Sequence, residues 1–202
     1  MSGGVEDVDL KSPTFYWNVA CEMARWLRSE GNVPPPMNLE GPIMQQGEQG
    51  RIAVPHVRYD RLYGGSGRYR TINPFVAGST GFVVGAWGAA LLANQYAKEK
   101  AQQNAQVRWR DEATAVVYIT SQRVITALPE RTLDFALSRV SAFHVDFDNW
   151  NTMLEFTGDV APLRLTGPPA PVLALWIAYG LFGSGWQKDS RFDRLGPLED
   201  QR

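Results

Sequence analysis

The sequence is poor in the side chains that build disulfides, metal clusters and redox centres. Cys21 is the one cysteine among 202 residues, and His56 and His144 are the only histidines. A single cysteine excludes an intrachain disulfide and a cysteine-based metal cluster within this chain. The acidic, polar start MSGGVEDVDL also lacks the basic residues and the apolar run of a secretory signal. Together these features predict a cytoplasmic protein.

The sequence motifs of the common enzyme classes are missing as well. No phosphate-binding P-loop, dinucleotide-binding glycine pattern, zinc-ligand spacing, nucleophile elbow or internal repeat occurs. We therefore expect a non-enzymatic protein with no cofactor and no metal, and rank an enzyme third among the functions considered. His144, Asp146 and Asp148 alternate along a predicted strand and so share a face, but a solvent-exposed strand face carries the same residue types.

The composition is that of an ordinary globular protein. Hydrophobic residues make up 44% of the chain and charged residues 20%, which favours one main domain over a disordered chain or a polytopic membrane protein. The formal net charge is −1. With so little excess positive charge, we expect no specific binding to nucleic acid.

The first 46 residues are expected to form a helical arm and a linker. Ser12 and Pro13 are typical of a helix start, and Gly31 of a helix end. Between them, apolar residues recur at spacings of three and four and share one face, namely Phe15, Val19, Met23, Trp26 and Leu27. Residues 32–46 are rich in proline, glycine and glutamine without a sustained period, and are predicted to be a linker.

Residues 47–183 are predicted to form the main domain. Short extended pieces begin at Arg51, with a glycine-rich hairpin turn at 64–67, and strand patterns resume at 115–119 and 124–128 and continue to 166. A helix that is apolar nearly all round follows the prolines near 170, and residues 184–202 are predicted to be a polar tail. This order predicts an α+β fold, with a mostly antiparallel sheet or split barrel capped by the C-terminal helix.

The main domain contains a long uncharged stretch, residues 71–97, which overlaps a helix predicted at about 75–106. Its length can cross a bilayer, but strand patterns lie on both sides of it, and one sheet cannot straddle a membrane. We therefore favour a helix packed in the fold or against another copy of the chain. Small residues let helix backbones approach closely, so the expected oligomer interface consists of Gly78, Gly81, Gly85 and Gly88.

The most basic segment of the chain precedes that stretch. Guanidinium groups match phosphate geometry, and tyrosines suit a membrane interface. The candidate ligand-binding residues are Arg51, Arg58, Arg61, Arg68, Tyr69 and Arg70. The alternative is that these side chains form the solvated outer face of a hairpin.

Three segments, GEQGRIAV, VVYITSQRVITAL and PLRLTGPPAPVLALWIAYGLFG, together resemble a pleckstrin-homology-like or GRAM-like domain of the kind found in actinobacterial proteins of similar layout. GEQGRIAV resembles the opening strand, VVYITSQRVITAL a hairpin, and PLRLTGPPAPVLALWIAYGLFG the last strand and capping helix. The resemblance implies a binding or adaptor module for an anionic membrane surface or a protein partner, cytoplasmic or membrane-associated. The alternative function is a structural protein that self-associates through the glycine-rich helix.

Overall fold

The computed structural model describes residues 12–29, 35–64 and 108–196. The chain divides into two compact units, residues 1–61 with 111–202 and residues 62–110. In the second unit, the described residues are 62–64 and 108–110. There the Nε of Arg110 donates a hydrogen bond of 2.9 Å to the Tyr63 carbonyl, and its guanidinium lies 5.7 Å from the centroid of the Tyr63 ring.

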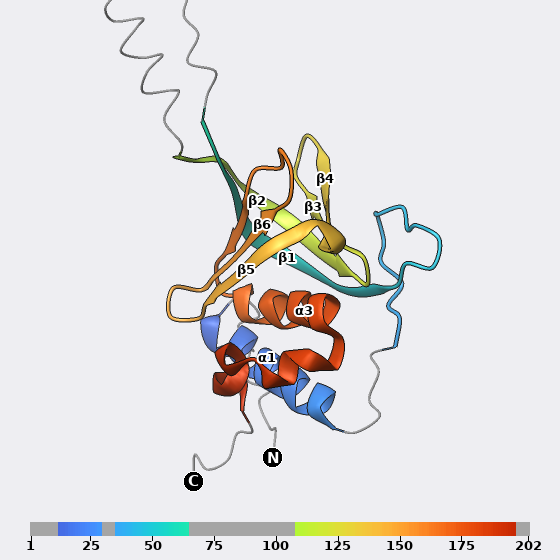
Figure 1. Ribbon diagram of the computed structural model, residues 1–202, viewed down its shortest axis with the longest axis vertical. Coiled ribbons are helices and arrows are strands. Elements are labelled where there is room, and N and C mark those ends of the chain that lie inside the picture. Colours follow the sequence, from blue (N-terminus) through green and yellow to red (C-terminus); the bar gives the residue numbers. More distant parts are fainter. Residues whose placement is uncertain (1–11, 30–34, 65–107, 197–202) are drawn as a thin grey trace, which may run out of the picture. The chain divides into compact units, whose positions relative to one another are not determined.

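The first unit is built on a curled sheet whose strands run in the order β4-β3-β2-β1-β7-β6-β5 (Figure 1). The paired strands whose register is defined are antiparallel. The expectation of an α+β fold with an antiparallel, partly closed sheet is thus confirmed. The strands are β1 (Gly50–Tyr63), β2 (Arg108–Thr120), β3 (Arg123–Ala127), β4 (Thr132–Ala136), β5 (Val140–Asp146), β6 (Asn151–Phe156) and β7 (Leu163–Thr166).

Alternating side chains explain why the sheet buries one face. In β6, Thr152, Leu154 and Phe156 are buried while the residues between them are partly exposed. Strand β1 continues through Pro55 and so joins two of the short extended pieces predicted from the sequence, residues 51–54 and 56–63. His56 has a φ of 60°, and burial shifts by one residue there, from Val54 to Val57, as at a β-bulge.

Two helices are stacked on one side of the curled sheet, with α3 next to the sheet and α1 beyond it (Figure 1). Helix α1 (Pro13–Arg28) begins as predicted, because the Ser12 hydroxyl accepts a hydrogen bond from the Phe15 N–H at 3.1 Å. Helix α3 (Ala170–Phe182) lies between the sheet and α1 and is buried on nearly all sides, which explains its apolar sequence. The predicted C-terminal helix is therefore confirmed.

Residues 183–195 differ from the predicted polar tail. They form the 3₁₀ helices η2 (Gly183–Lys188) and η3 (Ser190–Leu195), whose Trp186, Phe192 and Leu195 are fully buried. Arg28 in α1 holds this segment by donating hydrogen bonds to the carbonyls of Leu195, at 2.7 Å, and Phe192, at 3.0 Å. The prediction was wrong here because only three apolar residues are spread over a mostly polar segment, too few to show a period.

The predicted linker is also partly ordered by contacts with the sheet. Met37 forms an isolated antiparallel bridge with Gly50, and Leu39 is buried. A Cβ on Gly50 would lie 2.3 Å from the Met37 carbonyl oxygen, so this crossing requires glycine. The segment is thus bonded to the start of β1.

Two predictions fall outside the described residues. They are the hairpin turn at 64–67 beyond its first residue, with the strand that follows it, and the glycine-rich helix with Gly78, Gly81, Gly85 and Gly88. Among the helices that the structure describes, none has the length and apolar character needed to cross a bilayer.

Candidate functional site

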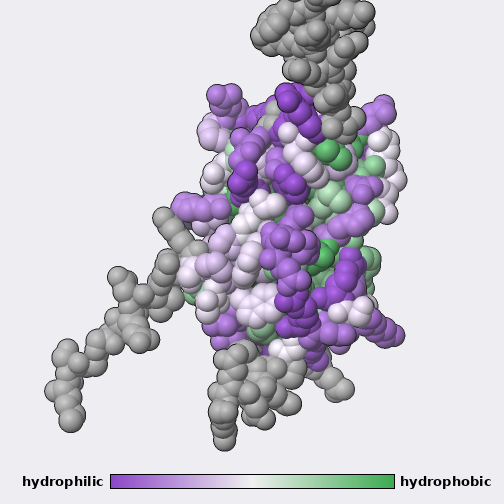
Figure 2. All heavy atoms as spheres, turned by 90° about the vertical axis from the view of Figure 1, so that its left-hand side faces the viewer, coloured by the Kyte–Doolittle hydropathy of each residue, from purple (hydrophilic) through white to green (hydrophobic). Residues whose placement is uncertain are grey.

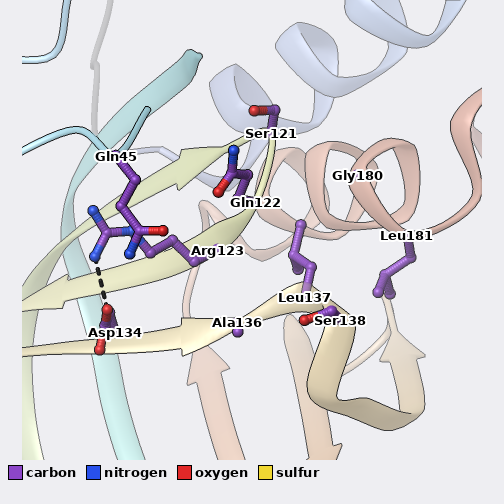
Figure 3. Close-up of a pocket in the computed structure, with 10 residues that line it drawn as sticks. All are labelled: Gln45, Ser121, Gln122, Arg123, Asp134, Ala136, Leu137, Ser138, Gly180 and Leu181. Carbon is purple, nitrogen blue, oxygen red and sulfur yellow. Dashed lines mark hydrogen bonds and ion pairs between the residues drawn. The ribbon is translucent and has the colours of Figure 1, made fainter. Parts of the chain in front are cut away.

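A cavity of about 490 Å³ opens where the β2–β3 turn, the 3₁₀ helix η1 (Leu137–Arg139) and the C-terminal end of α3 meet (Figure 3). Its polar rim consists of Gln45, Ser121, Gln122, Arg123, Asp134 and Ser138. Ala136, Leu137, Gly180 and Leu181 supply the rest of the lining. Gly180 allows α3 to approach η1 closely, because a Cβ there would lie 2.6 Å from Leu137 Cδ1.

The charged groups of this rim are already paired with one another. Arg123 donates to Asp134 Oδ2 at 2.7 Å, as Figure 3 shows, and to both carboxylate oxygens of Glu48 at 2.9 and 3.0 Å. The Thr120 hydroxyl donates to Glu48 Oε1 at 2.6 Å. Arg123 is therefore a structural cation that fastens residues 43–48 to the β2–β3 turn. Its charge is largely neutralised by the carboxylates of Glu48 and Asp134.

The environment of Glu48 sets its protonation. Burial by itself would raise the pKa of this carboxyl, but the hydrogen bonds from Arg123, Thr120 and the Gln45 N–H outweigh burial and lower the pKa from 4.5 to about 2. Glu48 is thus an anion at neutral pH. A group held ionised in this way is unsuited to proton transfer near neutrality.

A second, smaller cavity of about 130 Å³ shares Ser121 and Gly180 with the first. Its other lining residues are Arg51, Thr120, Trp176 and Tyr179. The Arg51 guanidinium lies 5.9 Å from the centroid of the Tyr179 ring and donates to Gln49 Oε1 at 2.9 Å.

The Trp176 indole is the least satisfied donor of this cavity. Its side chain is buried, and its N–H finds no hydrogen-bond acceptor in the described part of the chain. A buried donor without a partner costs free energy, and an acceptor from a bound molecule would recover it. This lining therefore suits an acceptor-rich, anionic group better than a cation, because it offers hydrogen-bond donors from Arg51, Trp176, Ser121 and Tyr179.

The three arginines of the predicted ligand site that the structure describes lie in different surroundings. Arg51 lines the small cavity. Arg58 forms an ion pair with Glu112 in which both side chains are exposed. Arg61 donates to the carbonyls of Ala161 and Pro162 and covers the Phe135 ring at 4.7 Å. The remaining members of the predicted set, Arg68, Tyr69 and Arg70, lie outside the described residues.

The alternating polar residues of β5 and the turn after it are engaged separately. His144 contacts Glu155 Oε1 at 2.9 Å, Asp146 accepts from Asn149, and Asp148 pairs with Arg194 at 2.8 Å. No cluster of three or more histidine, cysteine, aspartate or glutamate residues able to hold a metal occurs in ranges 12–29, 35–64 and 108–196.

Cys21 is also unsuited to a reactive role in this environment. It lies in the core beside α3, and its burial raises the pKa of the thiol despite the nearby Arg25 and Arg28.

Sequence reasoning missed Glu48 and Trp176. Glu48 lies in a polar, glycine-rich segment. Trp176 lies in an apolar helix, where a tryptophan is expected to be an ordinary core residue. Neither has a local signal. Glu48 pairs with Arg123, which is 75 residues away, and the cavity beside Trp176 is closed by residues such as Arg51 and Ser121 from other elements. Comparisons of the chain with protein-family models and with curated proteins found no match.

Proposed function

We propose that the protein is a non-enzymatic binding module, and that its first unit takes an anionic group of its partner into the small cavity beside Arg51. The proposal rests on Trp176, whose side chain lines that cavity and whose buried indole N–H has no acceptor among the described residues. The larger cavity alongside offers uncharged amide and hydroxyl groups, together with the paired Arg123 and Asp134, for the remainder of the ligand.

We further propose that the curled sheet and α3 form a pleckstrin-homology-like domain. The support is the element order, seven strands followed by one apolar helix, together with the sequence resemblance. Domains of that type mostly bind anionic lipid headgroups, membranes or protein segments. An anionic membrane surface is the ligand we favour, and an acidic segment of a protein is the other source of the same chemistry.

The first experiment tests the cavity itself with inorganic phosphate as the probe. Phosphate should shift the indole N–H resonance of Trp176 in a proton–nitrogen NMR spectrum, and Arg51→Gln should weaken the titration by roughly tenfold. The matched control is Arg25→Gln, which removes an equal charge from an exposed position on α1. Equal titrations in both variants would refute the assignment of Arg51.

The second experiment tests the membrane as the source of the anion. Co-sedimentation with phosphatidylcholine vesicles, with and without phosphatidylserine, should show binding only to the anionic vesicles and a steep loss with salt, since each basic residue near the surface contributes about 1 kcal/mol. Arg68→Glu with Arg70→Glu should abolish that binding. Arg25→Glu with Arg194→Glu changes the net charge equally and should not. Phosphate binding without vesicle binding would point to the protein partner instead.

A further inference from the structure

An aromatic pocket lies on a different part of the first unit, between the start of α1 and the β5–β6 turn, which are neighbours in Figure 1. It has a volume of about 330 Å³, and its walls include Trp17, Phe147, Trp150, Asp148 and Arg194. The side of the molecule on which these elements lie faces the viewer in Figure 2. The described atoms of that face are mostly hydrophilic or intermediate in hydropathy. The pocket is thus a small aromatic site on a polar surface.

The three rings meet edge to face. Trp17 lies 5.6 Å from Phe147 and 6.2 Å from Trp150, with interplanar angles of 88° and 79°. Ring faces carry partial negative charge, so rings turned toward one space favour a cation in it. The Asp148 carboxylate at the rim adds a full negative charge.

The pocket already contacts a cation of the chain itself. The Arg194 guanidinium lies 5.8 Å from the centroid of a Trp17 ring and 2.8 Å from Asp148 Oδ1. Both partners of this ion pair are more than half exposed, at 55% and 76%. Exposed pairs of this kind contribute little stability, so another guanidinium can replace Arg194 at small cost.

Trp150 adopts a conformation that its residue type disfavours. Its φ is 50°, in the left-handed region where glycine or asparagine is usual, at the end of a turn whose flanking residues Asp146 and Asn151 pair in register. Asn149 is available in the same turn, yet the bulky residue occupies the strained position. Strain of this kind collects at ligand-binding positions, and here its effect is to hold an indole at the pocket.

The start of α1 also borders the pocket, and it is already satisfied. Pro13 has no N–H to offer, and the Phe15 N–H is capped by the Ser12 hydroxyl. This helix end therefore has little tendency to bind an anion. The aromatic faces and Asp148 dominate the chemistry of the pocket.

We propose that this pocket binds the guanidinium group of an arginine side chain from a partner polypeptide, and that this group takes the place of Arg194 beside Trp17 and Asp148. The choice of arginine over other cations rests on the resident group, which shows that a guanidinium satisfies the ring and the carboxylate together. This site is separate from the anionic-group site beside Arg51, and neither requires the other.

The probe is N-acetyl-arginine amide, with N-acetyl-citrulline amide as its uncharged isostere. The arginine compound should shift the indole N–H resonances of Trp17 and Trp150 with a millimolar dissociation constant, and the citrulline compound should not. Arg194→Gln removes the competing guanidinium from Trp17 and Asp148, and should lower the dissociation constant of the arginine compound about threefold to tenfold. Asp148→Asn should weaken it about tenfold.

Trp150→Asn separates binding from folding. Asparagine tolerates a φ of 50°, so this variant should unfold at the same temperature as the parent or a higher one, while arginine binding falls about tenfold. An equal response to citrulline, unchanged binding in Arg194→Gln, or unchanged binding in a folded Trp150→Asn would each overturn the proposal. A response to tetramethylammonium but not to the arginine compound would overturn the assignment of guanidinium.

Discussion

The carboxylate of Glu48 and the guanidinium of Arg123 are joined by two hydrogen bonds, of 2.9 and 3.0 Å, across 75 positions of sequence. The Glu48 side chain has no exposed surface, and that of Arg123 is 12% exposed. This pair fastens the segment before β1 to the β2–β3 turn, at the rim of the larger cavity.

Replacing Glu48 by glutamine should therefore destabilise the protein by about 3 kcal/mol, because the mostly buried guanidinium of Arg123 would keep only the exposed Asp134 as its counter-ion. Urea unfolding measures the change. The comparison is Glu112→Gln, which removes one partner of the exposed pair with Arg58 and should cost less than about 1 kcal/mol. Equal losses in the two variants would contradict the structural role of Glu48.

The same carboxylate should make stability depend on pH in the acid range. The folded pKa of Glu48, about 2, lies below its ordinary value of 4.5, so the unfolded chain takes up the proton first. The stabilisation is complete above about pH 5 and is lost as pH falls toward 2, and it is on the order of 3 kcal/mol. Glu48→Gln should flatten this part of the curve. An acid limb of the same steepness in the variant would show that other carboxyls cause it.

Phe192→Ala tests the folded C-terminal segment. Phe192 is fully buried against Phe143, Phe147 and Trp186, so its truncation should cost about 3–5 kcal/mol. Phe182→Ala is the matched control, because that ring is 47% exposed and should lose far less. Chemical denaturation monitored by tryptophan fluorescence gives both values. A polar, unattached tail would make the two variants alike.

Gly50→Ala tests the crossing of the segment over β1. A Cβ there would lie 2.3 Å from a backbone oxygen that cannot move alone, so we expect a loss of about 1–3 kcal/mol in thermal unfolding. At Gly185 the nearest atom to such a Cβ is 3.7 Å away, and Gly185→Ala should be close to neutral. Similar melting temperatures for the two would rule out the close contact at Gly50.

The sequence predicted the elements whose signals are local. Ser12 and Pro13 marked the start of α1, and the apolar run after the prolines near 170 marked α3, because caps and periodicity act over a few residues. The curled antiparallel sheet also followed from the order of short strand patterns before one helix.

Features that depend on distant partners were not predicted. Trp186 and Phe192 are buried by residues of α1 and β5, which are distant in sequence. Glu48 contacts Arg123 only in the folded chain, because 75 positions separate them. Within the basic segment, Arg58 and Arg61 are close in sequence, yet Arg58 pairs with Glu112 of β2 and Arg61 covers the Phe135 ring.

The contact between η3 and β5 bears on how the protein avoids aggregation. Strand β5 lies at an edge of the sheet, and edge strands present backbone groups to which a foreign strand can pair. The side chain of Arg191 donates a hydrogen bond to the Phe143 carbonyl of β5, and Asp189 holds that guanidinium in place. A bulky charged group thus obstructs the approach of another strand. The segment that completes the core therefore also hinders edge-to-edge pairing between the sheets of two molecules.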